Sequence, residues 1–138
     1  MAQVIIYTNE NGGVSVCIPT GELPIEAVMA KDVPLGRGAR IVSYLELPNQ
    51  YNDFYNAWEM TEDDVIVNMD KAKELTKARL RAERTPLLAA QDVAFQRAME
   101  TGADTTAIVA EKNRLRDLPS LADACTTLEQ LRALKAEA

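Results

Sequence analysis

The chain has 138 residues, of which 47% are hydrophobic, and it carries a formal net charge of −6. A chain of this length suits one domain, or a small domain with an extension, and it is long enough for a hydrophobic core without disulfides or metal ions. The acidic balance argues against general nucleic-acid binding, which needs a positively charged surface. Histidine is absent, which removes the commonest general base and metal ligand and every Ser-His or Cys-His catalytic pair.

Cysteine usage and hydropathy predict a cytoplasmic protein. The only cysteines are Cys17 and Cys125, far apart in the sequence, so no disulfide framework is expected. No apolar run approaches the roughly 18–20 residues that a membrane helix needs. Residues 1–3 lack the basic and apolar segments of a signal peptide, so export is not expected.

The first predicted element is a β-hairpin. Residues 3–7 and 14–18 are rich in β-branched side chains, and residues 9–13, Asn-Glu-Asn-Gly-Gly, supply a tight turn between them. In the second strand, alternate residues from Val14 to Ile18 are predicted to face a core, and the residues between them to face solvent.

Further short elements complete a small β-rich domain over residues 1–67. A short helix is predicted from Pro24 to about Ala30, a third strand over residues 39–45 and a short fourth strand over residues 65–67. Residues 36–38, Gly-Arg-Gly, are predicted to be a plain loop. A phosphate-binding loop would need a preceding strand and a following Lys-Ser or Lys-Thr pair.

Four aromatic residues recur at i, i+3, i+4 and i+7, which predicts one face of a short helix. They are Tyr51, Phe54, Tyr55 and Trp58. We interpret them as a plug that closes the core of the β-rich domain, because such side chains bury large areas. The alternative is a binding hot spot for a partner protein, since Trp and Tyr dominate hot spots.

Residues 68–138 are predicted to be a helical region. Asn68 is expected to cap a long helix, and Gly102 to end it. Pro86 interrupts the pattern, because proline lacks an amide hydrogen and clashes with the carbonyl group four residues earlier. The helix over residues 69–100 is therefore predicted to be kinked at Pro86 or broken there, with Thr85 as a new cap.

Two shorter helices are predicted to follow. Asp104 or Thr105 is expected to cap the first, which ends at Leu118, and the spacing of Thr126 and Glu129 predicts a capping box before the second, over residues 128–135. The predicted fold class is α+β. A small N-terminal antiparallel sheet, made of the hairpin, one or two more strands and short helices, precedes a helical C-terminal half.

The helical region has a narrow, alanine-rich apolar stripe. Its bulky members are Leu80, Leu87, Leu88, Phe95, Ile108, Leu115 and Leu118. Helices with so few large apolar residues need tertiary packing to be stable. We expect the stripe to pack on the β-rich domain; self-association, or binding of a partner helix, is the alternative.

Residues 71–84 carry six basic side chains and only two acidic ones. This basic run is interpreted as a solvated helix face with ion pairs, or alternatively as a docking surface for an acidic partner. Together with the stripe it supplies the predicted partner-binding residues. These are Lys77, Leu80, Arg81, Leu87, Leu88 and Phe95.

Acidic residues give the only candidates for catalysis. Asp63, Asp64 or Asp92 would be the carboxylates of a small hydrolase, but no feature of the sequence places them beside a pocket. The acidic turn at residues 61–64 also lacks the alternating spacing and central glycine of a calcium loop. No catalytic, cofactor-binding or metal-binding residue is therefore predicted.

The order of several short motifs resembles a known family. The motifs are Lys31-Asp32-Val33-Pro34, Ala39-Arg40-Ile41-Val42, Leu47-Pro48, Asn56-Ala57-Trp58-Glu59, Val67-Asn68-Met69-Asp70-Lys71-Ala72, Arg79-Leu80-Arg81 with Arg84, Pro86-Leu87-Leu88, Asp92 and Leu115-Arg116-Asp117. Over nearly the whole chain, this order is similar to that of the small tail-associated accessory proteins of tailed bacteriophages and their prophages, described as tail or tail-fibre assembly chaperones.

The resemblance implies a non-enzymatic protein, without a cofactor, that binds a tail or tail-fibre protein during phage morphogenesis. It implies no catalytic residue and no nucleic-acid or membrane partner. The expected location is the cytoplasm of the infected bacterial host. The alternative is a permanent structural accessory subunit of the virion, in the tail or near the portal.

Overall fold

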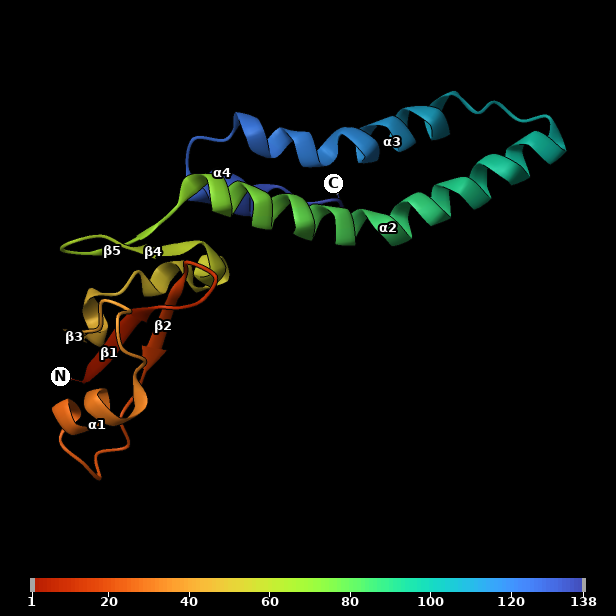
Figure 1. The fold of residues 1–138 in the computed structure, drawn as a ribbon. Coiled ribbons are helices and arrows are strands. Elements are labelled where there is room, and N and C mark those ends of the chain that lie inside the picture. The colour runs from red at the N-terminus through yellow and green to blue at the C-terminus, as the bar shows by residue number, and fades with distance from the viewer. Residues whose placement is uncertain (1, 138) are drawn as a thin grey trace. The chain divides into compact units, whose positions relative to one another are not determined.

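The computed structural model describes residues 2–137, and the chain divides into two compact units, Met1–Lys71 and Ala72–Ala138. The first unit holds the strands and the second is helical (Figure 1). This arrangement confirms the predicted α+β class, with a small antiparallel sheet followed by a helical half. The predicted boundary after residue 67 lies at the start of the long helix, four residues before the division at Lys71.

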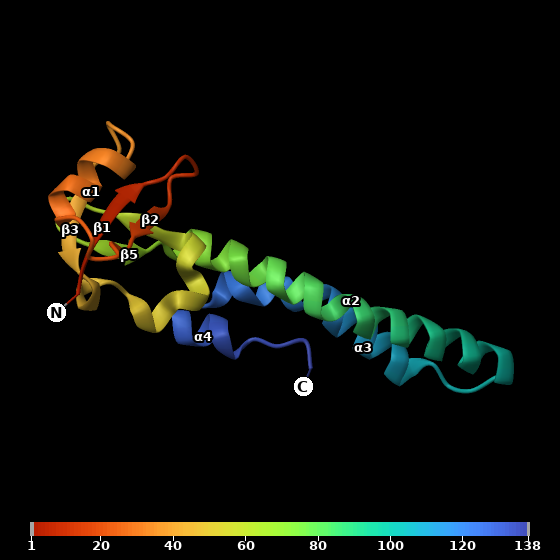
Figure 2. The same ribbon diagram turned by 90° about the horizontal axis from the view of Figure 1, so that it is seen from below.

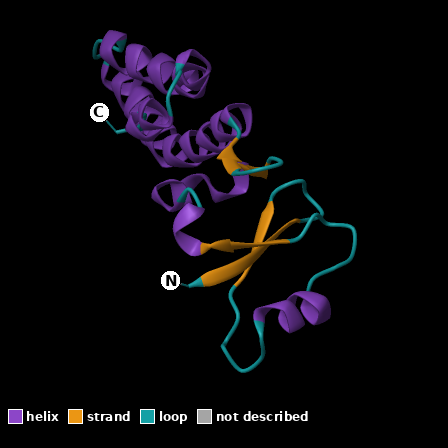
Figure 3. Cartoon of the chain, turned by 90° about the vertical axis from the view of Figure 1, so that its left-hand side faces the viewer, coloured by secondary structure: helices purple, strands orange, loops and turns teal. Residues whose placement is uncertain are grey.

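A three-stranded antiparallel sheet forms the centre of the first unit (Figure 3). The central strand pairs with both neighbours, so that Ile5 lies opposite Cys17 on one side and opposite Ile41 on the other. The predicted hairpin and third strand are confirmed. The strands, in spatial order, are β2 (Val14–Cys17), β1 (Gln3–Thr8) and β3 (Arg40–Ser43).

Both faces of this sheet are covered, so the expectation of one solvated face is wrong. Alternate side chains of a strand point to opposite faces, and each face has its own buried cluster. Val28 and Val33 enclose Ile5 on the face that carries Cys17. The covering helix is α1 (Ile25–Asp32). Ile18, predicted to face a core, lies beyond the end of β2 with 68% of its surface exposed.

The other face of the sheet is closed by the aromatic cluster. Trp58 packs with Val4, Ile6 and Val14 and is almost fully buried. Its indole Nε1 donates a hydrogen bond to the carbonyl oxygen of Tyr51 at 3.2 Å. The interpretation as a core plug is therefore confirmed for this residue.

The aromatic residues do not form a single helical face. Tyr51 and Phe54 have non-helical backbone angles within a 3₁₀ segment over Asn49–Ala57, and Trp58 already begins a strand. That strand, β4 (Trp58–Met60), pairs antiparallel with β5 (Val65–Val67) in a second, two-stranded sheet. The helical spacing of the aromatic residues concealed β4.

Tyr55 joins the aromatic cluster to the hairpin. Its hydroxyl group donates a hydrogen bond to the carbonyl oxygen of Val14, and its ring centroid lies 4.9 Å from that of Trp58. Partial burial raises the pKa of the Tyr55 hydroxyl above its ordinary value. The hydroxyl therefore stays protonated as a donor at neutral pH.

The long helix α2 (Met69–Thr101) begins and ends at the predicted residues. The Asn68 side chain accepts a hydrogen bond from the backbone N–H of Lys71 at 3.0 Å, as an N-cap does. Gly102 has a φ of +69°, and Ala103 donates to the carbonyl oxygen of Ala98 at 2.8 Å. This is the Schellman ending, in which glycine tolerates the left-handed conformation.

Pro86 bends α2 without breaking it. The helix is continuous over 33 residues, and in Figure 1 its axis changes direction about midway. A break with Thr85 as a new cap is therefore wrong. The hydroxyl group of Thr85 instead donates to the carbonyl oxygen of Arg81 at 2.8 Å, a bond to the preceding turn that favours bending.

Three short segments follow α2, and the second of them was not predicted. They are α3 (Thr106–Asp117), the 3₁₀ segment η3 (Leu118–Ala124) and α4 (Leu128–Ala133). Of the two predicted caps, Thr105 is the N-cap residue of α3, without a capping bond from its side chain, and the Asp104 carboxylate accepts from the backbone N–H of Thr106 at 3.0 Å.

The cap of α4 lies one residue later than predicted. Gln130 donates through its backbone N–H to the Thr127 hydroxyl oxygen at 3.1 Å, and its side-chain oxygen accepts from the N–H of Thr126 at 2.6 Å. The pairing of Thr126 with Glu129 is therefore wrong. Among the described residues, none of the helices combines the length and the apolar character of a membrane span.

We expect Trp58→Ala to lower the free energy of unfolding by about 3–5 kcal/mol, because the substitution opens a large cavity between the sheet and its cover. Leu35→Ala is the control. Leu35 is 98% exposed, and its substitution should change stability by less than about 0.5 kcal/mol. Urea unfolding followed by circular dichroism measures both. Equal stability of the two variants would contradict the role of Trp58 as the plug.

Candidate functional site

The apolar stripe of α2 is fully buried at Leu80. This residue is fully buried with Leu115, Leu118 and Ala136, and all of them belong to the helical unit. The predicted packing of the stripe was on the β-rich domain, but the side chains that enclose Leu80 come from α3, η3 and the C-terminal segment (Leu134–Ala136). The cluster forms where α2 meets these three stretches of the helical unit.

The basic run of α2 is largely used inside the helical unit. Lys77 places its Nζ 2.7 Å from Asp123 and 3.4 Å from Glu74, and the hydrogen bond to Asp123 raises the pKa of Lys77. Lys73 donates to the backbone carbonyl oxygen of the same Asp123 at 3.2 Å. Two lysines of α2 thus hold η3.

Two arginines of α2 bind the ends of the shorter helices. Arg84 donates to the carbonyl oxygens of Leu115 and Arg116 at 3.2 and 2.9 Å. Arg79 donates to those of Leu131 and Leu134 at 3.1 and 2.8 Å. Carbonyl groups in the last turn of a helix lack partners within the helix and carry the negative end of its dipole. The basic run therefore caps α3 and α4, a role that neither interpretation of the sequence included.

Ion pairs on α2 and α3 hold the C-terminal segment. Glu83, paired with Arg79 at 2.6 Å, accepts a hydrogen bond from the N–H of Ala136 at 3.1 Å. Arg114, paired with Glu111 at 2.6 Å, donates to the carbonyl oxygen of Ala136 at 2.7 Å. We call these four charged residues the backbone clamp.

The clamp carboxylates are tuned by their donors. The N–H of Ala136, followed by Arg79, holds the pKa of Glu83 below its ordinary value. The Arg114 guanidinium does the same for the pKa of Glu111. Both carboxylates are therefore charged at neutral pH.

Beyond the closed core, the stripe continues as a row of half-buried side chains that we call the distal stripe. Its members are Leu87, Leu88, Ala94, Phe95 and Ile108. In Figure 2, α4 and the C-terminal segment accompany only the first half of α2, while α3 lies beside the second half. The side chains of the distal stripe are only partly buried, which makes the stripe the candidate protein-binding site.

Phe95 sits at a charged bridge between the two helices. Lys112 of α3 places its Nζ 5.1 Å from the centroid of the Phe95 ring and 2.7 Å from the Asp92 carboxylate of α2. A cation over an aromatic face is attracted to it. This bridge holds the Phe95 ring in place. Asp92, one of the three carboxylates considered for catalysis, is engaged here in an ion pair with Lys112.

The six predicted partner-binding residues fall into three groups. Leu80 is fully enclosed and Lys77 is engaged by Asp123, so neither side chain lies free on the surface. Arg81 is exposed. The others, Leu87, Leu88 and Phe95, belong to the distal stripe. The clamp was missed, although the i,i+4 spacing of Arg79 and Glu83 is visible in the sequence.

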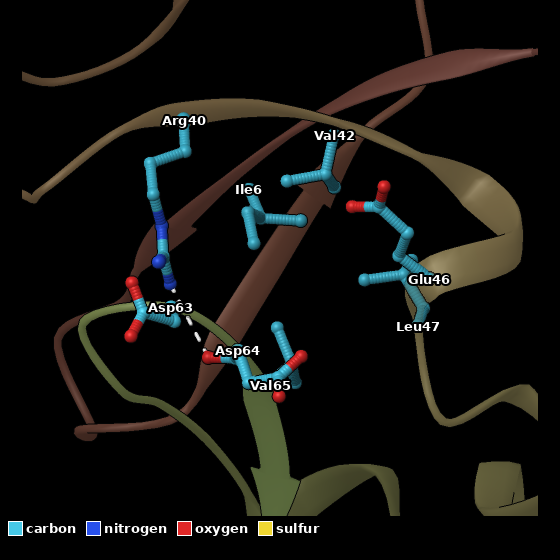
Figure 4. Close-up of a pocket in the computed structure, with 8 residues that line it drawn as sticks. All are labelled: Ile6, Arg40, Val42, Glu46, Leu47, Asp63, Asp64 and Val65. Carbon is cyan, nitrogen blue, oxygen red and sulfur yellow. Dashed lines mark hydrogen bonds between the residues drawn. The ribbon is translucent and has the colours of Figure 1, made fainter.

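The other two candidate carboxylates line a small pocket of the first unit (Figure 4). Arg40 reaches into it and donates to the carbonyl oxygens of Glu62 and Asp64 at 2.5 and 3.3 Å. These bonds fasten β3 to the acidic turn. The cavity of about 10 Å³ has room for roughly one water molecule. It therefore cannot hold an organic substrate.

Acidification is expected to loosen the helical unit through Glu83. Its pKa is lower in the folded state than in the unfolded chain, where it is about 4.3. Its charge therefore stabilises the fold above that pH, and this contribution disappears as the pH falls through the folded-state pKa. Arg79 and Lys135 are the cations that face it.

Urea unfolding at about pH 7 and about pH 3.5 measures this effect. Glu83→Gln keeps the shape of the side chain without the charge, so its stability should fall less between the two pH values than that of the wild type. The exposed Glu100→Gln is the matched control and should behave as the wild type does. Identical pH dependence of all three proteins would refute the contribution of Glu83.

Comparison with protein-family models, with curated proteins and with solved structures gave no match for this chain.

Proposed function

We propose that this chain is a non-enzymatic bacteriophage morphogenesis protein that binds a tail or tail-fibre protein as an assembly chaperone. The observation that carries the proposal is the half-buried distal stripe beside a fully closed core in the same unit. The order of sequence motifs supplies the phage context. In this proposal the protein acts in the cytoplasm of the infected bacterium.

The length of α2 explains why the stripe stays open. A helix of 33 residues is about 50 Å long, whereas a compact unit of roughly 70 residues has a radius of gyration near 11 Å. The short segments after α2 cannot enclose such a helix along its whole length. They enclose Leu80 and leave the distal stripe half-buried.

The size of the open surface favours a reversible complex. Fully burying a leucine or phenylalanine contributes about 1.5–3 kcal/mol, so completing the burial of five half-buried residues contributes on the order of 5 kcal/mol. Association itself costs about 4–15 kcal/mol. The distal stripe alone therefore gives weak binding, which suits a chaperone that releases its partner better than a permanent subunit.

An amphipathic helix of the partner is the structure that best fits this site. Residues spaced by three and four along such a helix match a narrow apolar stripe between two helices. The distal stripe presents mostly leucine and phenylalanine, and the Lys112–Asp92 bridge lies beside it. A partner helix with one apolar face would complete the burial.

Phe95→Asp is expected to abolish binding of the partner, because it places a charge in the stripe. Val93→Asp is the matched control: it lies two residues away on the same helix, and its side chain is already 49% exposed. Each variant is co-expressed with tail and tail-fibre proteins of the same phage, and the complex is purified through a tag. We expect at least a roughly tenfold loss for Phe95→Asp alone, about 1.4 kcal/mol.

Two outcomes would contradict the proposal. Undiminished binding by Phe95→Asp would remove the distal stripe from the interface. A stable homodimer of the chain that Phe95→Asp dissociates would make a second copy the occupant of the stripe. Mass spectrometry of purified particles then separates the two phage roles, since a permanent virion subunit is found in the particle and a chaperone is not.

A further inference from the structure

The C-terminal segment Leu134–Ala136 lies between α2 and α3 as an extended peptide. Leu134 has extended backbone angles, with φ −69° and ψ 126°. Its side chain packs on the core around Leu80, and so does that of Ala136, which is fully buried. The intervening Lys135 is exposed. Residues i and i+2 thus face the core, as they do along a strand that binds a surface.

The main chain of this segment is recognised by the backbone clamp. Arg79 donates to the carbonyl oxygen of Leu134 at 2.8 Å. Glu83 accepts from the N–H of Ala136, and Arg114 donates to its carbonyl oxygen, at 3.1 and 2.7 Å. In a β-sheet, a neighbouring strand would bind these main-chain groups of Leu134 and Ala136. Here the charged side chains of the clamp bind them instead.

The clamp sets the chemistry of what it can hold. Hydrogen bonds to the main chain do not depend on the identity of the side chains, so they give affinity for any extended segment. The two inward positions select by size. Ala136 has no exposed surface, so its place accepts only a small side chain, while the place of Leu134 accepts a large apolar one.

We infer that the backbone clamp is a peptide-binding site that the chain's own C-terminal segment fills at rest. Its second occupant is an extended segment of the protein partner, with a large apolar residue two positions before a small one, which displaces Leu134–Ala136. This inference deepens the proposed function and rests on it for the identity of the partner.

Two features favour replacement of the segment by a partner peptide over its release without a replacement. The segment covers Leu80 and Leu115, both fully buried, so leaving the site without a replacement exposes them to water. A matching segment of another protein covers them again and restores the three hydrogen bonds. Leu87 and Leu88 also pack against this core and belong to the distal stripe, so the stripe adjoins the core that the segment covers.

The test uses the full-length chain and a fluorescent peptide with the sequence of residues 130–137. Ala136→Arg cannot seat its own segment, and Ala133→Arg is the matched control because Ala133 is exposed three residues earlier. We expect Ala136→Arg to bind the peptide at least about tenfold more tightly than the wild type or the control. In those proteins, the tethered segment competes at a millimolar effective concentration.

Specificity is tested with a second peptide and a second variant. The same peptide with arginine in place of the Ala136 residue should not bind. Adding Glu83→Ala to the Ala136→Arg chain should also abolish binding, because it removes the acceptor for the peptide N–H. Binding that survives either change would overturn the assignment of the clamp.

Hydrogen exchange in the wild-type chain decides the matter even if Ala136→Arg fails to fold. We expect the Ala136 amide to exchange through a local opening, faster than the amides of Leu80 and Leu115, and faster still when added peptide displaces its segment from the clamp. Exchange of all three amides only by global unfolding would refute a displaceable segment.

A concentration-dependent dimer of Ala136→Arg would make a second copy of the chain the occupant of the clamp. It would overturn the assignment of a different protein as the partner.

These measurements need no phage protein. Failure of the peptide to bind would refute the clamp and leave the distal stripe and its phage partner untouched. Failure of the tail proteins to bind would refute the proposed function, while peptide binding would still show a working clamp.

Discussion

The helical unit depends on arginines of one helix that bind the carbonyl groups at the ends of two others. Arg84 and Arg79 supply donors where α3 and α4 have none of their own. Arginine suits this role because its guanidinium stays charged and offers several donors in a fixed plane. With so few large buried side chains, the unit needs these polar contacts to place its short helices along α2. Glu83, the acidic partner of Arg79, also accepts a hydrogen bond from the C-terminal segment.

The sequence predicted the features that local chemistry decides. Asn68 and Gly102 mark the ends of α2, because caps depend on one side chain and a few backbone groups. The hairpin was equally local. Trp58 was misplaced on a helix because the aromatic spacing fits a helix, while pairing with β5 depends on residues farther along the chain. The cap of α4 was wrong by one residue because Gln130 serves the helix end as well as glutamate does.

The candidate site was predictable only in part. A stripe containing Leu87, Leu88 and Phe95 follows from helical periodicity. Its division into a closed core and an open distal part does not, because that depends on how far α3 and the C-terminal segment reach along α2. The clamp was hidden for the same reason. Arg79 and Glu83 form an ordinary surface pair by spacing, and only the return of the C-terminal segment gives them Leu134 and Ala136 as partners.

Pro86 lies between the closed core and the distal stripe, and this position has a mechanical consequence. Proline removes one hydrogen bond from the helix ladder, so α2 is softest at the level where the enclosed part ends. The bend at Pro86 gives the outer part of α2 a direction of its own, while Leu80 stays enclosed. A single imino acid thus sets the direction in which the distal stripe extends from the closed core.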